Sequence, residues 1–540
     1  MVDTQAIKEL IDSLKSTCAN YGLGNDGNEF KIITQVFLYK FLNDKFAYEV
    51  KKLDNKLQNS KSWEQDIANY SEDDYAMLCL QLGGQTAILK PAHFITTLFN
   101  HQSDSDFGKT FDDTLIDISN ENADIFSVTT DGGAKERLFD RLTEFISDPS
   151  KRDDFAKAII NKLVNYNFEN IFKEKFDFFA TIFEYLLKDY NSDSGGKYAE
   201  YFTPHAVAKI MAAILVEDET QNVTVYDPSA GSGTLLMSVA HAIGEDKCTI
   251  YSQDISQKSS SLLRLNLILN NLVHSIQNII QGNTLTNPYH KDKATGGLKK
   301  FDFIVSNPPF KLDFSDYRDN LDTDVNKYRF FAGIATIPNK AVDKMEIYNL
   351  FVQHCIYSLS NKGQCAIVVP TGFITAQSKI NKNIRKHLID NNMLRGVVSM
   401  PSNIFATTGT NVSVLIFGNT KTNDDVVLID ASKLGNKVKE GKNQKTVLNE
   451  SEEQQIIETF NNKKVVDEFS VVVKNDEIKG KNYSFSAGQY FDIKIEYVDI
   501  TQKEFDNKLK GFHDRLENLF NEGSKLNNEI RDNLKELHLD

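Results

Sequence analysis

The feature that most constrains this chain is a strand-like run that ends abruptly at two prolines. Residues 301–305 are apolar, aromatic and β-branched, which is typical of a buried strand. The run stops at Asn307, because Pro308 and Pro309 can continue neither a strand nor a helix. Taken alone, the two prolines fit a turn that closes a strand. In open α/β sheets, however, ligands bind at this end of the strands, so the run also predicts a binding site.

The residues at the end of this strand are suited to activating an amino nitrogen. The lone pair of an exocyclic amine is conjugated and must leave that conjugation to attack an electrophile. The side-chain oxygen of Asn307 can accept one N–H of such an amine, and a main-chain carbonyl of the Pro308-Pro309 segment can accept the other. Two acceptors stabilise the positive charge that develops on nitrogen. Phe310 offers a face on which a planar base stacks.

A second motif joins a strand to a loop that contains glycines. Residues 223–226 have strand character, and Asp227 precedes a loop with Gly231 and Gly233. Because glycine has no Cβ, a ligand can approach this backbone closely. The loop is not a full dinucleotide fingerprint, since Leu236 occupies the third glycine position. Asp227 would repel a pyrophosphate but suits an amino group, so we expect a cofactor with a zwitterionic amino-acid part.

Two further candidate sites follow from element boundaries. The strand expected at 248–254 ends at Asp254, near the ~20-residue spacing from the glycine loop at which an acid meets ribose hydroxyls. The alternative is that Asp254 caps the helix expected at 257–269. Thr203 is expected to be a helix N-cap with Pro204 at the first helical position, which leaves polar groups free for a ligand. A capped helix start without a ligand is the alternative there.

The order of the expected elements predicts three regions. Residues 1–165 have helical spacing of apolar residues, and strand and helix patterns alternate between 166 and 420. Alternation of this kind predicts a doubly wound, Rossmann-like α/β sheet. The region 421–540 is charged and Asn-rich and ends in a helical stretch. We therefore expect an all-α N-terminal domain, an α/β catalytic domain and a C-terminal region with a helical tail.

The tail carries a narrow apolar stripe. From 505 to 537 apolar residues mostly recur every three, four or seven positions, which is typical of a helix with coiled-coil character. Such a stripe on a polar helix needs a partner, or it packs on its own domain. The formal net charge is −14, whereas a protein that holds DNA alone is usually basic. A chain of this charge could hold DNA only through a local basic patch or with a partner subunit.

The composition and the N-terminal sequence also indicate the cellular compartment of the protein. No apolar run of about 18 residues is present, so no membrane span is expected. The N-terminus lacks a secretory pattern. The five cysteines are scattered without a CxxC, which predicts free thiols in a reducing cytoplasm and no metal site.

At these motifs the sequence resembles a known family. Asn307-Pro-Pro-Phe310 is similar to the catalytic tetrapeptide of adenine-N6 DNA methyltransferases. Asp227-Pro-Ser-Ala-Gly-Ser-Gly233 resembles their S-adenosylmethionine loop, and Phe202-Thr-Pro204 resembles the motif that precedes it. With segments such as Ser399-Met-Pro-Ser-Asn-Ile-Phe405, most of the chain resembles the modification (M) subunit of type I restriction-modification systems.

The resemblance implies methyl transfer from S-adenosylmethionine to N6 of an adenine that is flipped out of duplex DNA. At Asn283 the family usually has Asp, so an uncharged amide would meet the cofactor's adenine. The implied catalytic residues are Asn307, Pro308, Pro309 and Phe310, and the implied cofactor-binding residues are Phe202, Thr203, Pro204, Asp227, Ser229, Gly231, Ser232, Gly233, Asp254 and Asn283.

A polar segment follows Phe310 and extends to residue 347. We expect it to form a mobile loop over the target base. Its basic residues, Arg318, Lys327 and Arg329, are either contacts to DNA or ordinary solvated charges.

The resemblance further implies that a partner reads the DNA sequence. A specificity (S) subunit would dock on the helix at about 500–540, and a second M subunit and a restriction (R) subunit would complete the complex. Alternatives with the same chemistry are an N4-cytosine or a protein-glutamine methyltransferase. A non-catalytic assembly subunit and a dinucleotide oxidoreductase are alternatives from other classes. The assembly subunit is disfavoured because the motif residues Asp227, Gly231, Asn307 and Phe310 are intact. The oxidoreductase would leave the Asn-Pro-Pro-Phe segment unexplained.

Overall fold

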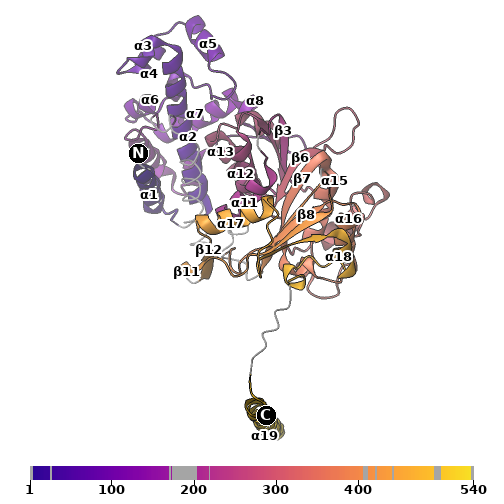
Figure 1. The fold of residues 1–540 in the computed structure, drawn as a ribbon. Coiled ribbons are helices and arrows are strands. Elements are labelled where there is room, and N and C mark those ends of the chain that lie inside the picture. The colour runs from indigo at the N-terminus through magenta and orange to yellow at the C-terminus, as the bar shows by residue number, and fades with distance from the viewer. Residues whose placement is uncertain are drawn as a thin grey trace. The chain divides into compact units, whose positions relative to one another are not determined.

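A computed structural model describes residues 4–24, 27–169, 172, 203–217, 219–405, 411–419, 423–440, 443–491 and 500–536. The chain divides into two compact units, Met1–Tyr490 and Phe491–Asp540. The first unit contains a helical lobe and a large sheet (Figure 1), and the second contains the long helix α19 (Gln502–Glu536). Among the described residues, no helix combines the length and the apolar character that crossing a bilayer requires.

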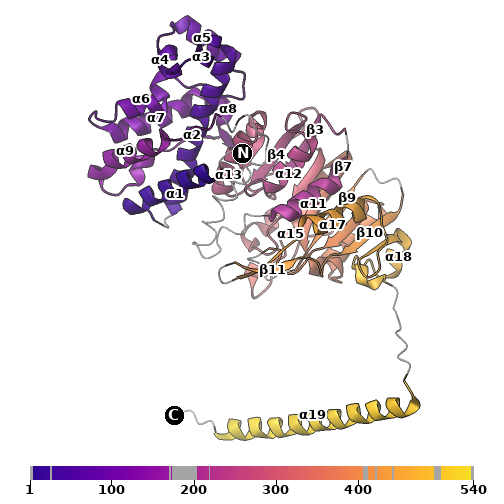
Figure 2. The ribbon, with the colours of Figure 1, turned by 60° about the vertical axis from the view of Figure 1, so that its left-hand side comes forward.

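The helical lobe is built around α2 (Gly27–Leu53). This helix is buried without a break from residue 36 to residue 44, including the ion pair between Lys40 and Asp44 at 3.0 Å. Trp63, the only tryptophan, packs on Phe94 with ring centroids 4.9 Å apart. In Figure 2 the lobe lies beside α13 (Gln257–Leu269). Its other helices are α1 (Thr4–Asn20), α3 (Asn55–Gln58), α4 (Trp63–Ala68), α5 (Glu72–Gln81), α6 (Ile95–Asn100), α7 (Phe107–Glu121), α8 (Ala123–Phe126) and α9 (Arg152–Leu163).

Within the described residues, eleven strands form one sheet in the order β13-β10-β8-β9-β7-β6-β3-β4-β5-β1-β2. Only β2, β9 and β13 run against the others, so most strands direct their carboxyl ends to one edge. The predicted doubly wound α/β sheet is confirmed. The strands are β1 (Val128–Thr130), β2 (Lys135–Glu136), β3 (Val223–Asp227), β4 (Cys248–Asp254), β5 (Ile279–Gln281), β6 (Phe301–Ser306), β7 (Leu359–Pro370), β8 (Leu394–Ser399), β9 (Val412–Gly418), β10 (Asp425–Asp430) and β13 (Ser470–Lys474).

Helices cover both faces of this sheet (Figure 1). One face carries α11 (His205–Leu215), α12 (Thr234–Ile243) and α13, and the other carries α15 (Tyr348–Ser358) and α16 (Lys379–Asp390). With apolar residues buried against helices on both sides, the central strands are nearly continuous hydrophobic runs, as β9 is from Val412 to Gly418. The remaining elements of this part are α14 (Arg318–Leu321), the hairpin β11 (Asn436–Glu440) and β12 (Asn443–Val447), α17 (Glu450–Asn461) and α18 (Asn475–Gly480).

The sheet extends beyond residues 166–420 at both ends. β1 pairs in parallel with β5, Thr129 opposite Ile280, although 1–165 was expected to be all-α. Strands of three and two residues are too short to show a periodic pattern in sequence. At the other end, β10 pairs with β8, and β13 pairs with β10. The domain boundaries at 165 and 420 stay predictions.

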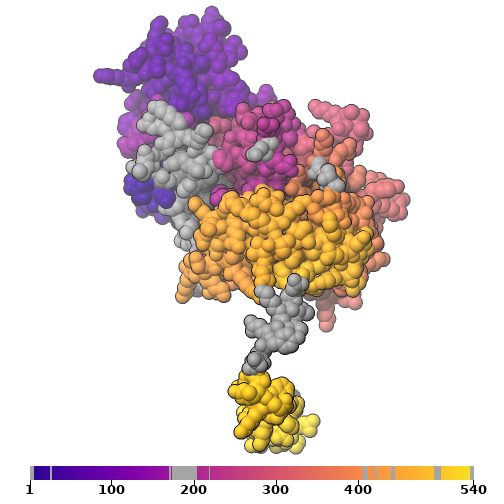
Figure 3. Space-filling model, in the orientation of Figure 1, coloured from indigo at the N-terminus to yellow at the C-terminus, as the bar shows by residue number. Residues whose placement is uncertain are grey.

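The residues after β9 also cover one face of the first unit. Figure 3 shows them as a continuous band of orange and yellow atoms. In this band α17 lies against α11, where Lys209 pairs with Glu453 at 2.8 Å and Asn461 donates to the carbonyl of Ala213. The C-terminal region up to Tyr490 is thus part of the same compact unit as the sheet.

Candidate active site

The two motifs predicted from the sequence meet at one edge of the sheet. β3, β4, β5 and β6 are parallel neighbours, so their carboxyl ends lie side by side. A cavity at this edge is lined by residues from both motifs and from the start of α11: Thr203, Asp227, Ser229, Ala230, Gly231, Thr234, Leu235 and Asn307. The parallel order explains why residues 104 positions apart, Thr203 and Asn307, share one cavity.

The glycine loop needs its glycines for two physical reasons. Gly231 and Gly233 have φ values of +53° and +84°, a region that side chains with a Cβ rarely adopt. A Cβ on Gly233 would also lie 2.2 Å from Cδ1 of Leu263, which belongs to α13. The loop therefore brings the start of α12 close to its neighbour helix and leaves bare backbone facing the cavity. Ser232, between the two glycines, is fully buried, and its carbonyl accepts a hydrogen bond from Asn266.

Asp227 is a buried carboxylate at the end of β3. It is 1% exposed, and Ser229 N donates to its Oδ1 at 2.9 Å. The Ser229 hydroxyl lies 2.7 Å from that of Ser306, so the loop is joined to the end of β6. Burial raises the pKa of Asp227 to about 7, the charge of Asp254 adds to this shift, and hydrogen bonds from Ser229 and Ser306 oppose it. Among the described residues no lysine or arginine pairs with Asp227, so a cationic group would find an uncompensated carboxylate there.

Asp254 is tied to the glycine loop. Its Oδ2 accepts a hydrogen bond from Gly231 N at 2.9 Å, and its Oδ1 accepts one from Ser256 N at 2.8 Å. Burial raises the pKa of this carboxyl group. The alternative role as the cap of α13 is wrong, because the hydroxyl of Ser256 caps that helix by accepting from Ser259 N.

Asn283 lies just after β5 and caps a turn. Its Oδ1 accepts from Leu285 N at 3.0 Å and from Thr286 N at 3.4 Å. Burial raises the pKa of the Tyr317 hydroxyl, and a hydrogen bond with the Asn283 side chain opposes that shift. Asn283 thus lies between the end of β5 and Tyr317, which comes from the segment after Phe310.

The expected cap at the start of α11 is wrong in one respect. Pro204, with ψ of 136°, is itself the residue before the helix, and the first helical residue is His205. Thr203 therefore does not cap the helix. Its hydroxyl instead accepts a hydrogen bond from Nδ2 of Asn307 at 3.2 Å. Phe202, the third residue predicted in this segment, lies outside the described residues.

The Asn-Pro-Pro-Phe segment leaves the sheet as expected. β6 ends at Ser306, and the next four residues are partly buried, buried, exposed and partly buried. Because the amide nitrogen of Asn307 donates to Thr203, its side-chain oxygen is left to accept from a ligand. The ring of Phe310 meets that of Tyr348 nearly edge-on, with centroids 6.4 Å apart. Tyr348 in turn donates to Asn381 at 3.0 Å, so the aromatic ring is braced from behind.

Three residues near the site were missed or misjudged from the sequence. Ile255 follows Asp254 at the end of β4, and 63% of it is exposed. Tyr317 contacts Asn283 from the segment after Phe310. Arg329 is 3% exposed, so both interpretations of it, as a contact to DNA and as a solvated charge, are wrong. No local pattern distinguishes these residues, because their role depends on neighbours far away in sequence.

Arg329 instead fastens its segment to the strand edge. Its Nη2 donates to the carbonyl of Leu285 at 2.6 Å and to that of Thr284 at 3.2 Å. Burial lowers the pKa of its guanidinium group to about 10. The two other basic candidates are engaged at the surface, since Arg318 pairs with Asp319 and Asp322, and Lys327 with Asp324.

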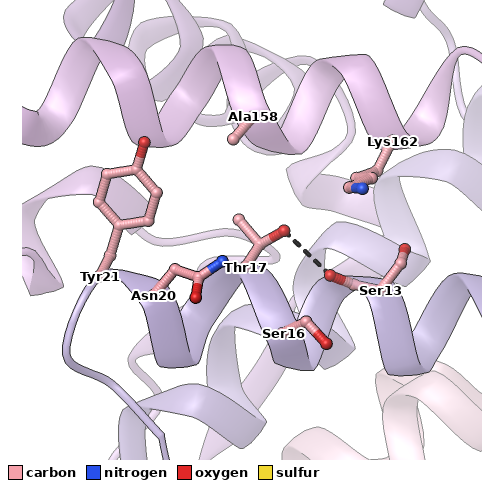
Figure 4. A pocket seen from close by; sticks show the side chains of 7 residues that line it. All are labelled: Ser13, Ser16, Thr17, Asn20, Tyr21, Ala158 and Lys162. Carbon is pink, nitrogen blue, oxygen red and sulfur yellow. Dashed lines mark hydrogen bonds between the residues drawn. The ribbon is translucent and has the colours of Figure 1, made fainter.

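A larger hollow lies elsewhere and carries no motif residue. Figure 4 shows it between α1 and α9, with a volume of about 580 Å³. The hydroxyl groups of Ser13, Ser16 and Thr17 donate to carbonyls of their own helix. Size alone therefore does not locate the site, whereas the strand edge does.

A parallel sheet with a glycine loop, a buried acid before it and an amide at the end of the adjacent strand is the Rossmann-like arrangement expected of an S-adenosylmethionine-dependent methyltransferase. Residues 174–497 match the family described as N-6 DNA Methylase. The chain belongs to this family. The prediction of an adenine-N6 DNA methyltransferase is confirmed by that membership.

Known relatives agree over nearly the whole length. The chain is 26% identical to the type I restriction enzyme MpnII methylase subunit of Mycoplasma pneumoniae, over 95% of this chain and 93% of that protein. It is 25% identical to the MjaIX methylase subunit of Methanocaldococcus jannaschii, over 75% and 71% respectively. The crystal structure of the type I restriction-modification methyltransferase subunit from Streptococcus thermophilus has a TM-score of 0.69 at 22% identity and covers 91% of this chain and 99% of that one. The resemblance to type I M subunits is confirmed.

Proposed function

We propose that this chain transfers the methyl group of S-adenosylmethionine to N6 of an adenine flipped out of duplex DNA, as the modification subunit of a type I restriction-modification complex. The observation that carries the proposal is the orientation of Asn307. Its amide nitrogen is bound to Thr203, and its oxygen is left for an amine in the cavity that also holds Asp227.

The residues at the strand edge fit the cofactor. Asp227 is a buried carboxylate without a cationic partner among the described residues, and it suits the amino group of a methionine moiety. Asp254, at the end of the next strand, suits ribose hydroxyls. The exposed side chain of Ile255 and the amide of Asn283 suit the apolar face and the polar edge of an adenine ring. When bound, S-adenosylmethionine supplies an electrophilic methyl group.

The remaining assigned cofactor residues shape the backbone. Gly231 and Gly233 adopt conformations with positive φ, and Ser229 and Ser232 fix the loop between β3 and α12. Thr203 links the cofactor side of the cavity to Asn307, with Pro204 behind it and Phe202 assigned by resemblance.

Catalysis then consists of positioning and charge stabilisation. The oxygen of Asn307 and the carbonyl of Pro308 accept the two N–H bonds of the adenine amine, and Pro309 offers no competing donor. The face of Phe310, held by Tyr348, stacks on the flipped base. The proton leaves nitrogen after methylation, so no dedicated general base is required. Correct placement of both reactants accounts for most of the rate.

The domain organisation and partners belong to the same proposal. Residues 1–165 form a helical lobe, 166–420 the catalytic domain and 421–540 a C-terminal region, with strands from both flanking regions completing the sheet. The specificity subunit docks on α19, where apolar side chains are 49–69% exposed. A second M subunit and a restriction subunit complete the assembly on double-stranded DNA in the cytoplasm.

The experiment is a methyl-transfer assay with tritiated S-adenosylmethionine and plasmid DNA. The chain is assayed alone and with the specificity subunit encoded beside it. We expect label in N6-methyladenine only when both are present. Label in N4-methylcytosine, or in protein and not in DNA, would assign a different amine substrate. DNA methylation by the chain alone would show that it does not need the specificity subunit to recognise DNA.

Asn307→Ala tests the catalytic assignment. We expect methyl transfer to fall by at least a hundredfold, because removing one preorganised acceptor costs about that factor, while cofactor binding stays within twofold. Asn419→Ala is the matched control, since this exposed amide bonds only a carbonyl outside the cavity. Wild-type transfer rates in Asn307→Ala would show that the site is misassigned.

A further inference from the structure

A basic hairpin projects from the C-terminal region of the first unit. β11 and β12 pair with each other in antiparallel register, Asn436 opposite Val447, and are not part of the eleven-stranded sheet. The twelve residues of this hairpin contain four lysines and one glutamate, in a chain whose formal net charge is −14. The local charge is thus opposite to that of the whole molecule.

The hairpin leaves the sheet at the edge that carries the site. β10 runs parallel to β8 and in the same direction as β6, so Asp430 and Ser306 end at the same edge. β11 begins six residues after β10 ends. Its partner strand is anchored there, since Thr446 donates from N to the carbonyl of Asn403 at 3.0 Å and from Oγ1 to that of Ser402 at 2.6 Å. Figure 1 shows the hairpin beside α17, outside the layers of the sheet.

Two lysines of the hairpin present free charge. Lys437 and Lys439 are exposed and lie on the same face of β11, because side chains alternate along a strand. Their cross-strand neighbours, Thr446 and Gln444, are uncharged. Neither lysine forms an ion pair with any residue that the structure describes. The lysines at 433, 463, 464 and 474, in contrast, each pair with a carboxylate.

We propose that Lys437 and Lys439 bind backbone phosphates of the DNA next to the flipped adenine. The proposal rests on the proposed function, which requires duplex DNA to approach the edge that carries Asn307. Residues two apart on a strand are about 7 Å apart, so the two ammonium groups can meet separate phosphates. Lysine is suited to phosphate contacts that position DNA without reading its sequence. The hairpin thus supplies a local basic surface on an acidic chain.

The test uses the Lys437→Ala/Lys439→Ala double variant in complex with the specificity subunit. Fluorescence anisotropy with a duplex that contains the recognition site gives the affinity over a series of salt concentrations. We expect the slope of log K against log salt to fall by about 2 per M chain, since each phosphate contact contributes about 0.9, and the affinity at 0.1 M salt to fall at least tenfold. Methylation of every accepted sequence should weaken uniformly, with cofactor affinity unchanged.

Lys247→Ala/Lys362→Ala is the matched control. These exposed lysines lie at the opposite edge of the sheet, just before β4 and in the first part of β7, and should leave the salt slope unchanged. An unchanged slope in the hairpin variant, with normal methylation by the wild type, would overturn this proposal and leave the proposed function intact. Loss of complex assembly with an unchanged slope would assign the hairpin to a protein partner instead. Absence of methylation in the wild type would count against the proposed function itself.

Discussion

At the scale of single residues, the site depends on groups whose ordinary chemistry is changed by burial. Asp227 is a carboxyl group with hydrogen bonds from Ser229 and Ser306 but no positive partner among the described residues, and burial raises its pKa to about 7. Below that pH the folded chain holds a proton that the unfolded chain releases above about 4. Asp227 therefore reduces the stability of the ligand-free protein as the pH rises from about 4 to about 7. A cationic ligand would reverse that loss.

The pH dependence of cofactor binding follows from this shift. We expect the affinity for S-adenosylmethionine to rise about tenfold between pH 6 and pH 8, because the ionised fraction of a group with a pKa near 7 changes by that factor. Isothermal titration calorimetry at several pH values measures it. Asp227→Asn should bind more weakly and lose this component of the pH profile, while the titration of the cofactor itself is common to both proteins. If the affinities of the wild type and of Asp227→Asn changed in parallel with pH, another residue would bind the amino group of the cofactor.

The sequence was sufficient for residues whose role is local. Where a strand end is followed by Asn-Pro-Pro-Phe or by a glycine loop, the local sequence locates the candidate site residues. Asn307, Asp227 and Gly233 do lie at the expected edge of the sheet. Thr203 was predicted to be a helix N-cap whose hydroxyl is left for a ligand, because the partner of that hydroxyl, Asn307, is 104 residues away in sequence. Long-range contacts of this kind leave no local periodicity.

At the scale of elements, the segment between Phe310 and α15 differs most from expectation. It was expected to be a mobile loop, yet it contains short helical turns and α14, and Phe314, Leu321 and Phe330 are buried. The guanidinium group of Arg329 fastens it to the carbonyls that follow Asn283. Gln353 of α15 holds it from the other side by accepting from Ala332 N at 2.7 Å. The segment that we propose lies over the target base is thus joined to the strand end that we propose binds the adenine of the cofactor.

Arg329→Met tests that connection. Loss of the guanidinium group leaves two buried carbonyls without donors, which costs about 1–3 kcal/mol. We expect a lower melting temperature and a KM for S-adenosylmethionine that rises several-fold more than the KM for DNA. Lys327→Met is the control, because both Lys327 and its partner Asp324 are largely exposed, and it should change neither value appreciably. If both substitutions changed the KM for S-adenosylmethionine equally, the contact of Arg329 with the carbonyls of Thr284 and Leu285 would not be what links the segment to the cofactor site.

At the scale of the whole molecule, the described residues of the second unit form one helix without an internal core. Phe505, Leu509, Phe512 and Leu516 form one stripe along α19, and each is about half exposed or more. A single helix of this kind gains little stability by itself and gains it instead from a partner that covers the stripe. The periodicity was visible in the sequence, whereas the strands that residues 128–136 and 425–474 add to the sheet were not, because pairing partners far apart in sequence decide them.

Leu509→Asp/Leu516→Asp tests the docking role of α19. We expect the complex with the specificity subunit to be lost in size-exclusion chromatography with light scattering. The melting temperature of the free chain and its cofactor affinity should stay unchanged, because the first unit contains the sheet and its core. Asn507→Asp/Asn518→Asp adds the same charge on the polar side of the helix and should assemble normally. Assembly of both variants would exclude the stripe as the docking surface.

The pairing of β1 with β5 also bears on how the chain is made. Thr129 is synthesised about 150 residues before Ile280, its partner. At usual rates of translation the helical lobe therefore waits roughly 8–30 s on the ribosome with the edge of β1 unpaired. During that time β2 is its only neighbour strand in the sheet, and the other edge stays open until the glycine loop, β4 and α13 have emerged. The part of the chain that contains the candidate site thus completes the fold of the part made before it.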